Sequence, residues 1–180
     1  MQSLFGGALV ADFPAPKWLD ASDVRPVPDH QEVWLEPAGA QRSLIIEILE
    51  LAECASTASA EFHFEDLATS NGATSSRVIG SSTLDVKRLR PSLQKATGCF
   101  LLHGLQELPP TENTGLVSSK IEVRLGVVRL DAKSSDILVS ICRPRGSTGE
   151  TAAVDTAADA ELLASVLSTL DIRDSAIFGE

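Results

Sequence analysis

Aromatic residues are scarce in this sequence: they make up 4% of its 180 residues, and tyrosine is absent. Hydrophobic residues nevertheless account for 43% of the chain, which is enough to form one sizeable core. We therefore expect a core made mainly of Leu, Ile, Val and Ala. A chain of 180 residues favours one domain, and we predict a single domain over residues 1–180.

Cysteine is also rare, and its three copies, Cys54, Cys99 and Cys142, are widely separated. The sequence contains no C-x-x-C pair, which excludes zinc-ribbon and thioredoxin-like proteins. Cys99 and Cys142 fall within apolar runs, so we expect them to be reduced residues of the core. Unpaired cysteines of this kind are typical of a cytosolic or nuclear protein.

Basic residues are too few for a nucleic-acid-binding protein. The chain has 15 Lys and Arg against 25 Asp and Glu, a formal net charge of -10, whereas binding to nucleic acid requires cations that neutralise phosphates. A basic protein is the more natural partner. No apolar run reaches the ~18–20 residues of a membrane span, and the N-terminal apolar stretch lacks a basic start and is interrupted by Asp12. We therefore expect a soluble intracellular protein without membrane insertion.

Motifs of common enzyme classes are missing as well. The sequence has no GxxxxGK[ST] phosphate loop, no GxGxxG, no GxSxG and no HExxH, so we predict no catalytic residue and no cofactor. His63, Glu65 and Asp66 are the exception, because His63 and Asp66 would lie one turn apart on a helix and could pair or bind a metal. Since a metal site needs three or four ligands, a metal-dependent enzyme using these residues is a minor alternative. The structural alternative is a histidine that is hydrogen-bonded at the edge of the core.

The stretch Asp20–Trp34 combines a helix start, a turn and a strand entry. Asp20 can cap a short helical turn, and Pro26 and Pro28 prevent that turn from continuing as a helix. Residues 31–37 alternate apolar and polar side chains and therefore predict a strand. These residues alone favour a rigid connection, because most polar loops are only connections, and a binding segment is the alternative.

Hydrophobic periodicity predicts the remaining elements. Alternation and apolar runs indicate a strand or hairpin over residues 4–13, which Gly6 and Gly7 would bend, and strands over 77–84, 98–105, 120–130 and 136–143. Three- to four-residue spacing indicates helices over 44–54, 61–70 and 156–170. Turn-forming residues indicate loops over 109–114 and 143–156. The segment 44–54 could also be a buried strand, but its length and the three-residue spacing of Glu47, Glu50 and Glu53 favour a helix. Ser59 is a candidate cap for the helix over 61–70, and Asn71–Gly72 would end it. Consecutive strands with short connections predict an antiparallel sheet flanked by helices, an α+β fold of α/β/α sandwich type.

Carboxylates are concentrated in the first third of the chain, where few cations accompany them. They could form a solvated face that keeps the protein soluble. Alternatively, they could form an acidic docking surface whose binding depends on salt. Charge alone favours the solvated face.

Several sequence blocks resemble the Mog family of Ran-binding proteins, also called Ran guanine-nucleotide-release factors. The blocks are Leu4–Ala8, Asp20 to Arg25, Val27 to Val33, Ser43–Glu50, Phe62–Leu67, Val128–Leu130 and Asp136–Ile141. The resemblance implies a fold similar to that of the photosystem protein PsbP. It also implies a monomer in the nucleus and cytoplasm that binds the small GTPase Ran, promotes nucleotide release and supports nuclear protein import.

The resemblance further suggests which side chains contact the partner. The matching residues are Asp20, Arg25, Asp29, Gln31, Glu32, Glu47, Glu50, Glu65 and Asp66. Their carboxylates could pair with basic residues of the GTPase or compete with phosphate for the cations that hold it. A scaffold of the same fold with another partner, such as a membrane channel, is the alternative interpretation.

Overall fold

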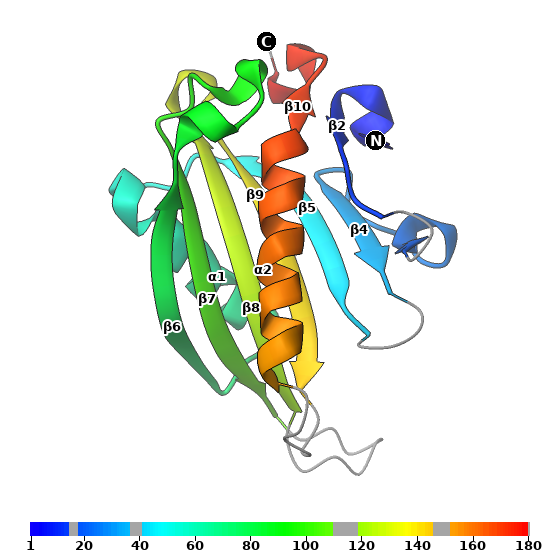
Figure 1. Ribbon diagram of the computed structural model, residues 1–180, viewed down its shortest axis with the longest axis vertical. Coiled ribbons are helices and arrows are strands. Elements are labelled where there is room, and N and C mark those ends of the chain that lie inside the picture. Colours follow the sequence, from blue (N-terminus) through cyan, green and yellow to red (C-terminus); the bar gives the residue numbers. More distant parts are fainter. Residues whose placement is uncertain (15–17, 37–40, 110–118, 146–151, 180) are drawn as a thin grey trace.

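The fold is built on a seven-stranded sheet. The structure is a computed structural model that describes residues 1–14, 18–36, 41–109, 119–145 and 152–179. The strand order is β3-β4-β5-β9-β8-β7-β6 (Figure 1), and every neighbouring pair is antiparallel. The strands are β3 (Leu19–Asp20), β4 (Gln31–Leu35), β5 (Ser43–Glu50), β6 (Ser75–Leu84), β7 (Gly98–Leu108), β8 (Ser119–Leu130) and β9 (Ser135–Arg145).

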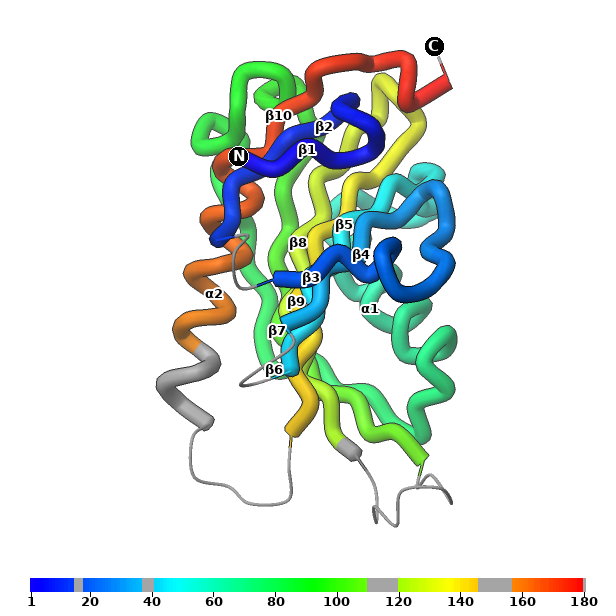
Figure 2. Tube along the Cα trace, turned by 90° about the vertical axis from the view of Figure 1, so that its right-hand side faces the viewer, coloured from blue at the N-terminus to red at the C-terminus, as the bar shows by residue number. Residues whose placement is uncertain are grey.

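Two α-helices cover opposite faces of this sheet. Helix α1 (Ser59–Ser70) lies on one side and helix α2 (Ala152–Thr169) on the other (Figure 2). The predicted α+β class, with an antiparallel sheet between helical layers, is confirmed. Among the described residues, no helix is long and apolar enough to cross a membrane.

A small second sheet closes one end of the molecule. It contains β1 (Gln2–Leu4), β2 (Leu9–Ala11) and β10 (Asp171–Ile172), with β2 in the middle. The hairpin between β1 and β2 turns at Gly6 and Gly7, whose φ angles of 64° and 100° favour glycine. The predicted hairpin in this region is thus confirmed. Its strand β2 also pairs with β10, which brings the two ends of the chain together.

The sheet separates two hydrophobic cores. The core on the α2 side contains Leu44, Ile46 and Val139 from the central strands and Leu167 from the helix. On the α1 side, Phe64 packs against apolar side chains of β7, β8 and β9, which include Leu102, Val123, Leu125 and Leu138. Because both faces of the central strands are covered, these strands are apolar along most of their length.

The helix predicted over residues 44–54 is wrong. These residues form strand β5, which pairs with β4 on one side and β9 on the other. A strand that is buried on both faces has an almost continuous apolar run and cannot be told from a buried helix by periodicity. The three-residue spacing of Glu47, Glu50 and Glu53 therefore does not form a helical stripe.

The other two predicted helices are present in the structure as α1 and α2, and one predicted cap differs. Ser59 lies within α1, and its hydroxyl donates to the Ser56 carbonyl at 2.8 Å instead of capping the helix. Asn71 ends α1 as predicted, and Gly72 follows with a φ angle of 64°. The predicted loops over 109–114 and 143–156 fall partly outside the described residues.

Candidate docking surface

A groove runs between helix α1 and the sheet face formed by β4, β5 and β9. Its volume is about 340 Å³, and its polar lining consists of His30, Gln31, Glu47, His63, Asp66, Ser70, Asn71 and Ser140. We call it the α1 groove. The connection that leads into β4 lies on the same side of the sheet as α1 (Figure 2). Strand β4, strand β5 and helix α1 thus each contribute one of the predicted contact residues: Gln31, Glu47 and Asp66.

Strand geometry places Glu47 in this groove. Along β5, Ile46 points to the core under α2, so the next side chain points to the α1 face. Glu47 is opposite Gln31 in the β4–β5 register, and its Oε1 accepts a hydrogen bond from Gln31 Nε2 at 2.6 Å. Burial raises the pKa of the Glu47 carboxyl, while the Gln31 hydrogen bond opposes this effect. Its ionised form is therefore poorly solvated, and a cation from a partner would stabilise it.

His63 belongs to a buried structural network. Only 4% of its side chain is exposed, and its Nε2 lies 2.9 Å from Oδ2 of the fully buried Asp136. The same oxygen accepts a hydrogen bond from the Ala52 backbone at 3.1 Å and lies 3.6 Å from Arg129. A histidine held in this way orients α1 on the sheet.

The structure separates the three residues considered as metal ligands. His63 faces Asp136, whereas the Glu65 carboxylate is exposed and accepts a hydrogen bond from the Ser76 hydroxyl at 2.8 Å. Within the described parts of the chain, no group of three or more His, Cys, Asp or Glu side chains could hold a metal ion. The geometry therefore favours the structural interpretation of His63.

The outward side of α1 presents carboxylates around an exposed aromatic ring. Phe62 is 48% exposed and lines a shallow hollow of about 520 Å³ together with Glu61, Glu65 and Asp66. We call these four residues the α1 outer face. Phe62 was not among the predicted contacts, although helical spacing could have identified it. With Phe64 facing the core, a residue two positions earlier lies on nearly the opposite side of the helix.

Comparison with known proteins places the chain in a family. The family described as "Ran-interacting Mog1 protein" matches residues 2–144. The chain belongs to this Mog1 family. Among relatives, it is 34% identical to the nuclear import protein mog1 of Schizosaccharomyces pombe, over 82% of this chain and 78% of the relative. It is 35% identical to the human Ran guanine nucleotide release factor, over 78% and 74% of the two chains.

Solved structures support the fold of this Mog1 family member. The crystal structure of the Saccharomyces cerevisiae Ran-binding protein Mog1p superimposes with a TM-score of 0.75 at 23% identity. The match covers 98% of this chain and 96% of that protein. A mutant of the protein Mog1 gives a TM-score of 0.73 at 22% identity, over 98% and 97% of the two chains. The α+β architecture is thus that of the Mog1 proteins.

Two predicted contact residues have structural partners outside the α1 groove. Glu32 neighbours Gln31 on β4 but points to the opposite face, where its Oε1 accepts a hydrogen bond from the Phe5 backbone. Burial raises the pKa of the Glu32 carboxyl. Asp20 accepts a hydrogen bond from the Ser22 backbone at 2.9 Å and so caps the 3-10 helix Ala21–Asp23. In this Mog1 protein, both side chains hold the fold locally.

The remaining predicted residues are exposed and lie near the ends of elements. Arg25 follows the 3-10 helix, Asp29 lies in the turn before β4, and Glu50 ends β5. The turn is closed by a 2.9 Å hydrogen bond from the Gln31 backbone to the Pro28 carbonyl. None of these three side chains forms an ion pair or hydrogen bond within the described ranges. They remain candidate contacts around the α1 groove.

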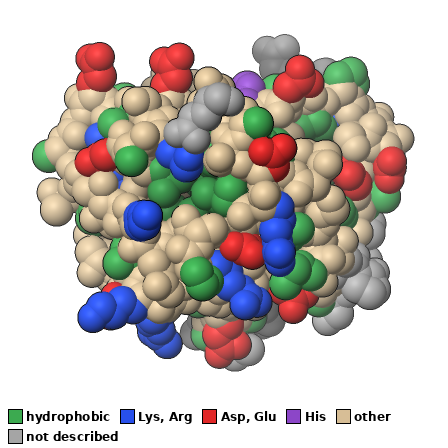
Figure 3. All heavy atoms as spheres, turned by 90° about the horizontal axis from the view of Figure 1, so that it is seen from above, with side chains coloured by type: hydrophobic (Ala, Val, Ile, Leu, Met, Phe, Trp, Pro, Cys, Tyr) green, Lys and Arg blue, Asp and Glu red, His purple; other side chains and the backbone are tan. Residues whose placement is uncertain are grey.

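Cations gather at a different end of this Mog1 protein. Lys87, Arg88, Arg90 and Lys95 lie on the connection from β6 to β7, and all four are exposed. Seen from this end, Lys and Arg side chains lie around an apolar patch, and Asp and Glu side chains lie among and beyond them (Figure 3). These four cations would repel a basic partner, so the surface around α1 is the better match for one.

Proposed function

We propose that this protein binds the small GTPase Ran and promotes release of its guanine nucleotide, and thereby supports nuclear protein import. The observation that carries this proposal is the position of Glu47. Its carboxylate is poorly solvated in the α1 groove, and Asp66 lines both this groove and the neighbouring hollow that contains the exposed Phe62. A half-buried carboxylate accompanied by exposed carboxylates and an exposed aromatic ring is suited to a basic protein surface, because a cation that docks there would stabilise the Glu47 charge, which water reaches poorly.

Nucleotide release follows from preferential binding. A protein that binds empty Ran more tightly than loaded Ran must, by reciprocity, weaken the affinity of Ran for its nucleotide. The nucleotide phosphates are held by cations, and carboxylates of the α1 groove and the α1 outer face would compete with phosphate for them. The backbone of Gln31 is fixed by the turn at Pro28 and by pairing with Glu47, which lowers the ordering cost of binding.

Such a role requires no covalent chemistry. We propose a non-enzymatic regulator that acts as a monomer, without a cofactor, and forms one domain over residues 1–180. Activity on Ran would place the protein in the nucleus and the cytoplasm. The family names of the relatives support this proposal, since both a nuclear import protein and a Ran guanine nucleotide release factor are among them.

Charge reversal on α1 tests the proposed surface. We expect Asp66→Lys and Glu65→Lys each to weaken binding to Ran about tenfold or more, because like charges would then face each other across the interface. Glu161 is an exposed carboxylate of α2, on the other side of the sheet, and Glu161→Lys is the matched control. Isothermal titration with Ran measures the affinities, and thermal unfolding verifies that each variant is folded.

Two results would contradict the surface assignment. Equal weakening by Glu161→Lys and Asp66→Lys would mean that net charge, and not the α1 surface, determines binding. Undiminished affinity in both α1 variants, with both proteins folded, would place the interface elsewhere on the molecule.

A further inference from the structure

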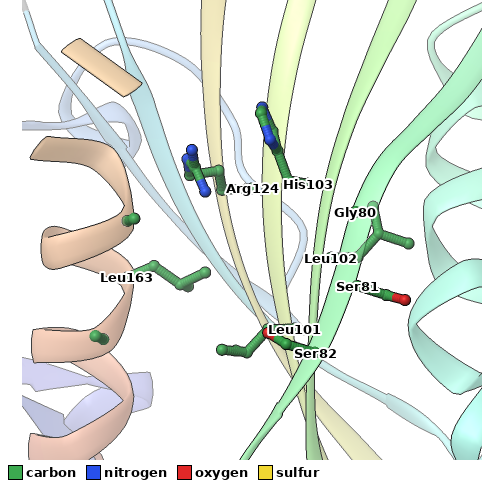
Figure 4. Close-up of a pocket in the computed structure, with 10 residues that line it drawn as sticks. Gly80, Ser81, Ser82, Leu101, Leu102, His103, Arg124 and Leu163 are labelled. Carbon is green, nitrogen blue, oxygen red and sulfur yellow. The ribbon is translucent and has the colours of Figure 1, made fainter. Parts of the chain in front are cut away.

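A second cleft lies on the α2 side of the sheet, opposite the α1 groove. It has a volume of about 330 Å³ and is formed by β6, β7, β8 and α2. We call it the α2 cleft. The residues used below are Gly80, Ser82, Leu101, His103, Arg124 and Leu163 (Figure 4). None of them belongs to the surface proposed for Ran, so the α2 cleft needs its own explanation.

Arg124 differs from most of the arginines on this face of the sheet. Three of them have carboxylate partners: Arg42 binds Glu36 and Asp159, Arg143 binds Asp159, and Arg145 binds Glu122. Arg124 forms no ion pair and no side-chain hydrogen bond within the described residues, and its Nε is buried without a partner. A buried N–H group without an acceptor is unfavourable, so an acceptor that reached Nε from the cleft would stabilise the folded protein.

The α2 cleft has a polar end and an apolar end. His103 and Arg124 are paired in the β7–β8 register, and their side chains lie next to each other at one end (Figure 4). His103 Nε2 lies 2.6 Å from Glu122 Oε1, which fixes the ring beside the arginine. Leu101 and Ser82 lie at the other end, and Leu163 of α2 faces them across the cleft (Figure 4).

We propose that the α2 cleft binds a small amphipathic carboxylate. Its head group would accept charge-assisted hydrogen bonds from the Arg124 guanidinium, which is well suited to a planar carboxylate. Its aliphatic tail would lie between Leu101 and Leu163 and leave water. The ligand thereby supplies the acceptor that Nε of Arg124 lacks, and its charge replaces the carboxylate partner that the neighbouring arginines have.

Octanoate is a suitable probe because it combines a carboxylate with an aliphatic chain. We expect titration of the full-length protein with octanoate to shift the amide resonances of residues 80–82, 101–103 and 160–164 in a saturable manner. Octanol lacks the charge and inorganic phosphate lacks the tail, so each should bind at least about tenfold more weakly. Arg124→Gln should weaken octanoate binding about tenfold or more, because it removes the charge.

The control variant is Arg88→Gln, which removes an exposed arginine that lies on the connection from β6 to β7 and does not line the cleft, and it should leave octanoate binding unchanged. Ser82→Phe tests the apolar end, since a ring at this exposed position would fill the cleft and should abolish binding whether or not Arg124→Gln folds. The absence of saturable shifts at about 10 mM octanoate would overturn the proposal. Unchanged octanoate binding in a folded Arg124→Gln variant or in Ser82→Phe would also overturn it. The same holds if octanol or phosphate binds as tightly as octanoate.

Discussion

Glu47 and Gln31 show how a single residue pair can serve partner binding at a cost to the folded state. Burial raises the pKa of the Glu47 carboxyl, so the folded protein favours the protonated form. The contribution of Glu47 to the free energy of unfolding is therefore fully present below the ordinary carboxyl pKa. It is lost as the pH rises through the raised pKa of the folded protein. Burial thus makes the ionised form of Glu47 less favourable than that of a solvated carboxylate, which is typical of a functional group.

Substitution of Glu47 by Gln should separate stability from function. Glutamine keeps an acceptor for the Gln31 amide, so we expect the free energy of unfolding at pH 7 to be unchanged or to rise by at most about 1 kcal/mol. The part of the pH dependence above pH ~4.5 that stems from Glu47 should disappear. Affinity for Ran should fall, since the charge is lost. Urea unfolding from pH 4 to 8 measures the first two effects; a variant clearly less stable at pH 7 would contradict this interpretation.

Glu32 follows Gln31 in the chain, but its side chain supports the fold and does not face the α1 groove. Its carboxylate accepts a hydrogen bond from the Phe5 backbone, so Glu32→Ala leaves that N–H group without its acceptor. We expect a loss of stability of about 1–2 kcal/mol and faster hydrogen exchange of the Phe5 amide. Affinity for Ran should change little in the folded fraction. Unchanged exchange at Phe5 would show that this contact does not hold the N-terminal hairpin.

Among the secondary-structure elements, β5 shows where sequence reasoning fails and why. Most strands, both helices and the turn at Asn71–Gly72 could be predicted from periodicity and turn chemistry. The segment over β5 could not, because a strand covered on both faces lacks the alternation that identifies a strand. The error also affects the candidate surface: on a helix Glu47 would align with Glu50, whereas on the strand it faces Gln31 in the α1 groove.

The packing of α1 on the sheet depends on a glycine of β7. A methyl group at Gly104 would clash with the ring of Phe64, which is fully buried. We therefore expect Gly104→Ala to destabilise the protein by about 1–3 kcal/mol through overpacking. Gly80→Ala on β6 is the control, because a methyl group there meets no atom within 4 Å, and it should be neutral or slightly stabilising. Thermal unfolding of both variants measures this; equal effects would refute the close approach of Phe64 to β7.

At the scale of the whole molecule, the fold distributes charge unevenly. The chain carries a net charge of -10, yet four exposed cations lie together on the connection between β6 and β7. Carboxylates of β5 and α1 meet on a different surface. The fold class could be predicted from the order of the elements. The grouping of Gln31, Glu47 and Asp66 could not, because it depends on strand pairing and on the position of α1 over the sheet.

Release of a fluorescent guanine nucleotide from Ran is the most direct test of the central claim. Ran loaded with labelled GDP should lose it faster when this protein is added at about 1 μM, in the range of a typical transient complex. Asp66→Lys should accelerate release much less than the unmodified protein, and Glu161→Lys should be as effective as the unmodified protein. A release rate unchanged by the unmodified protein at this concentration would contradict the proposed function.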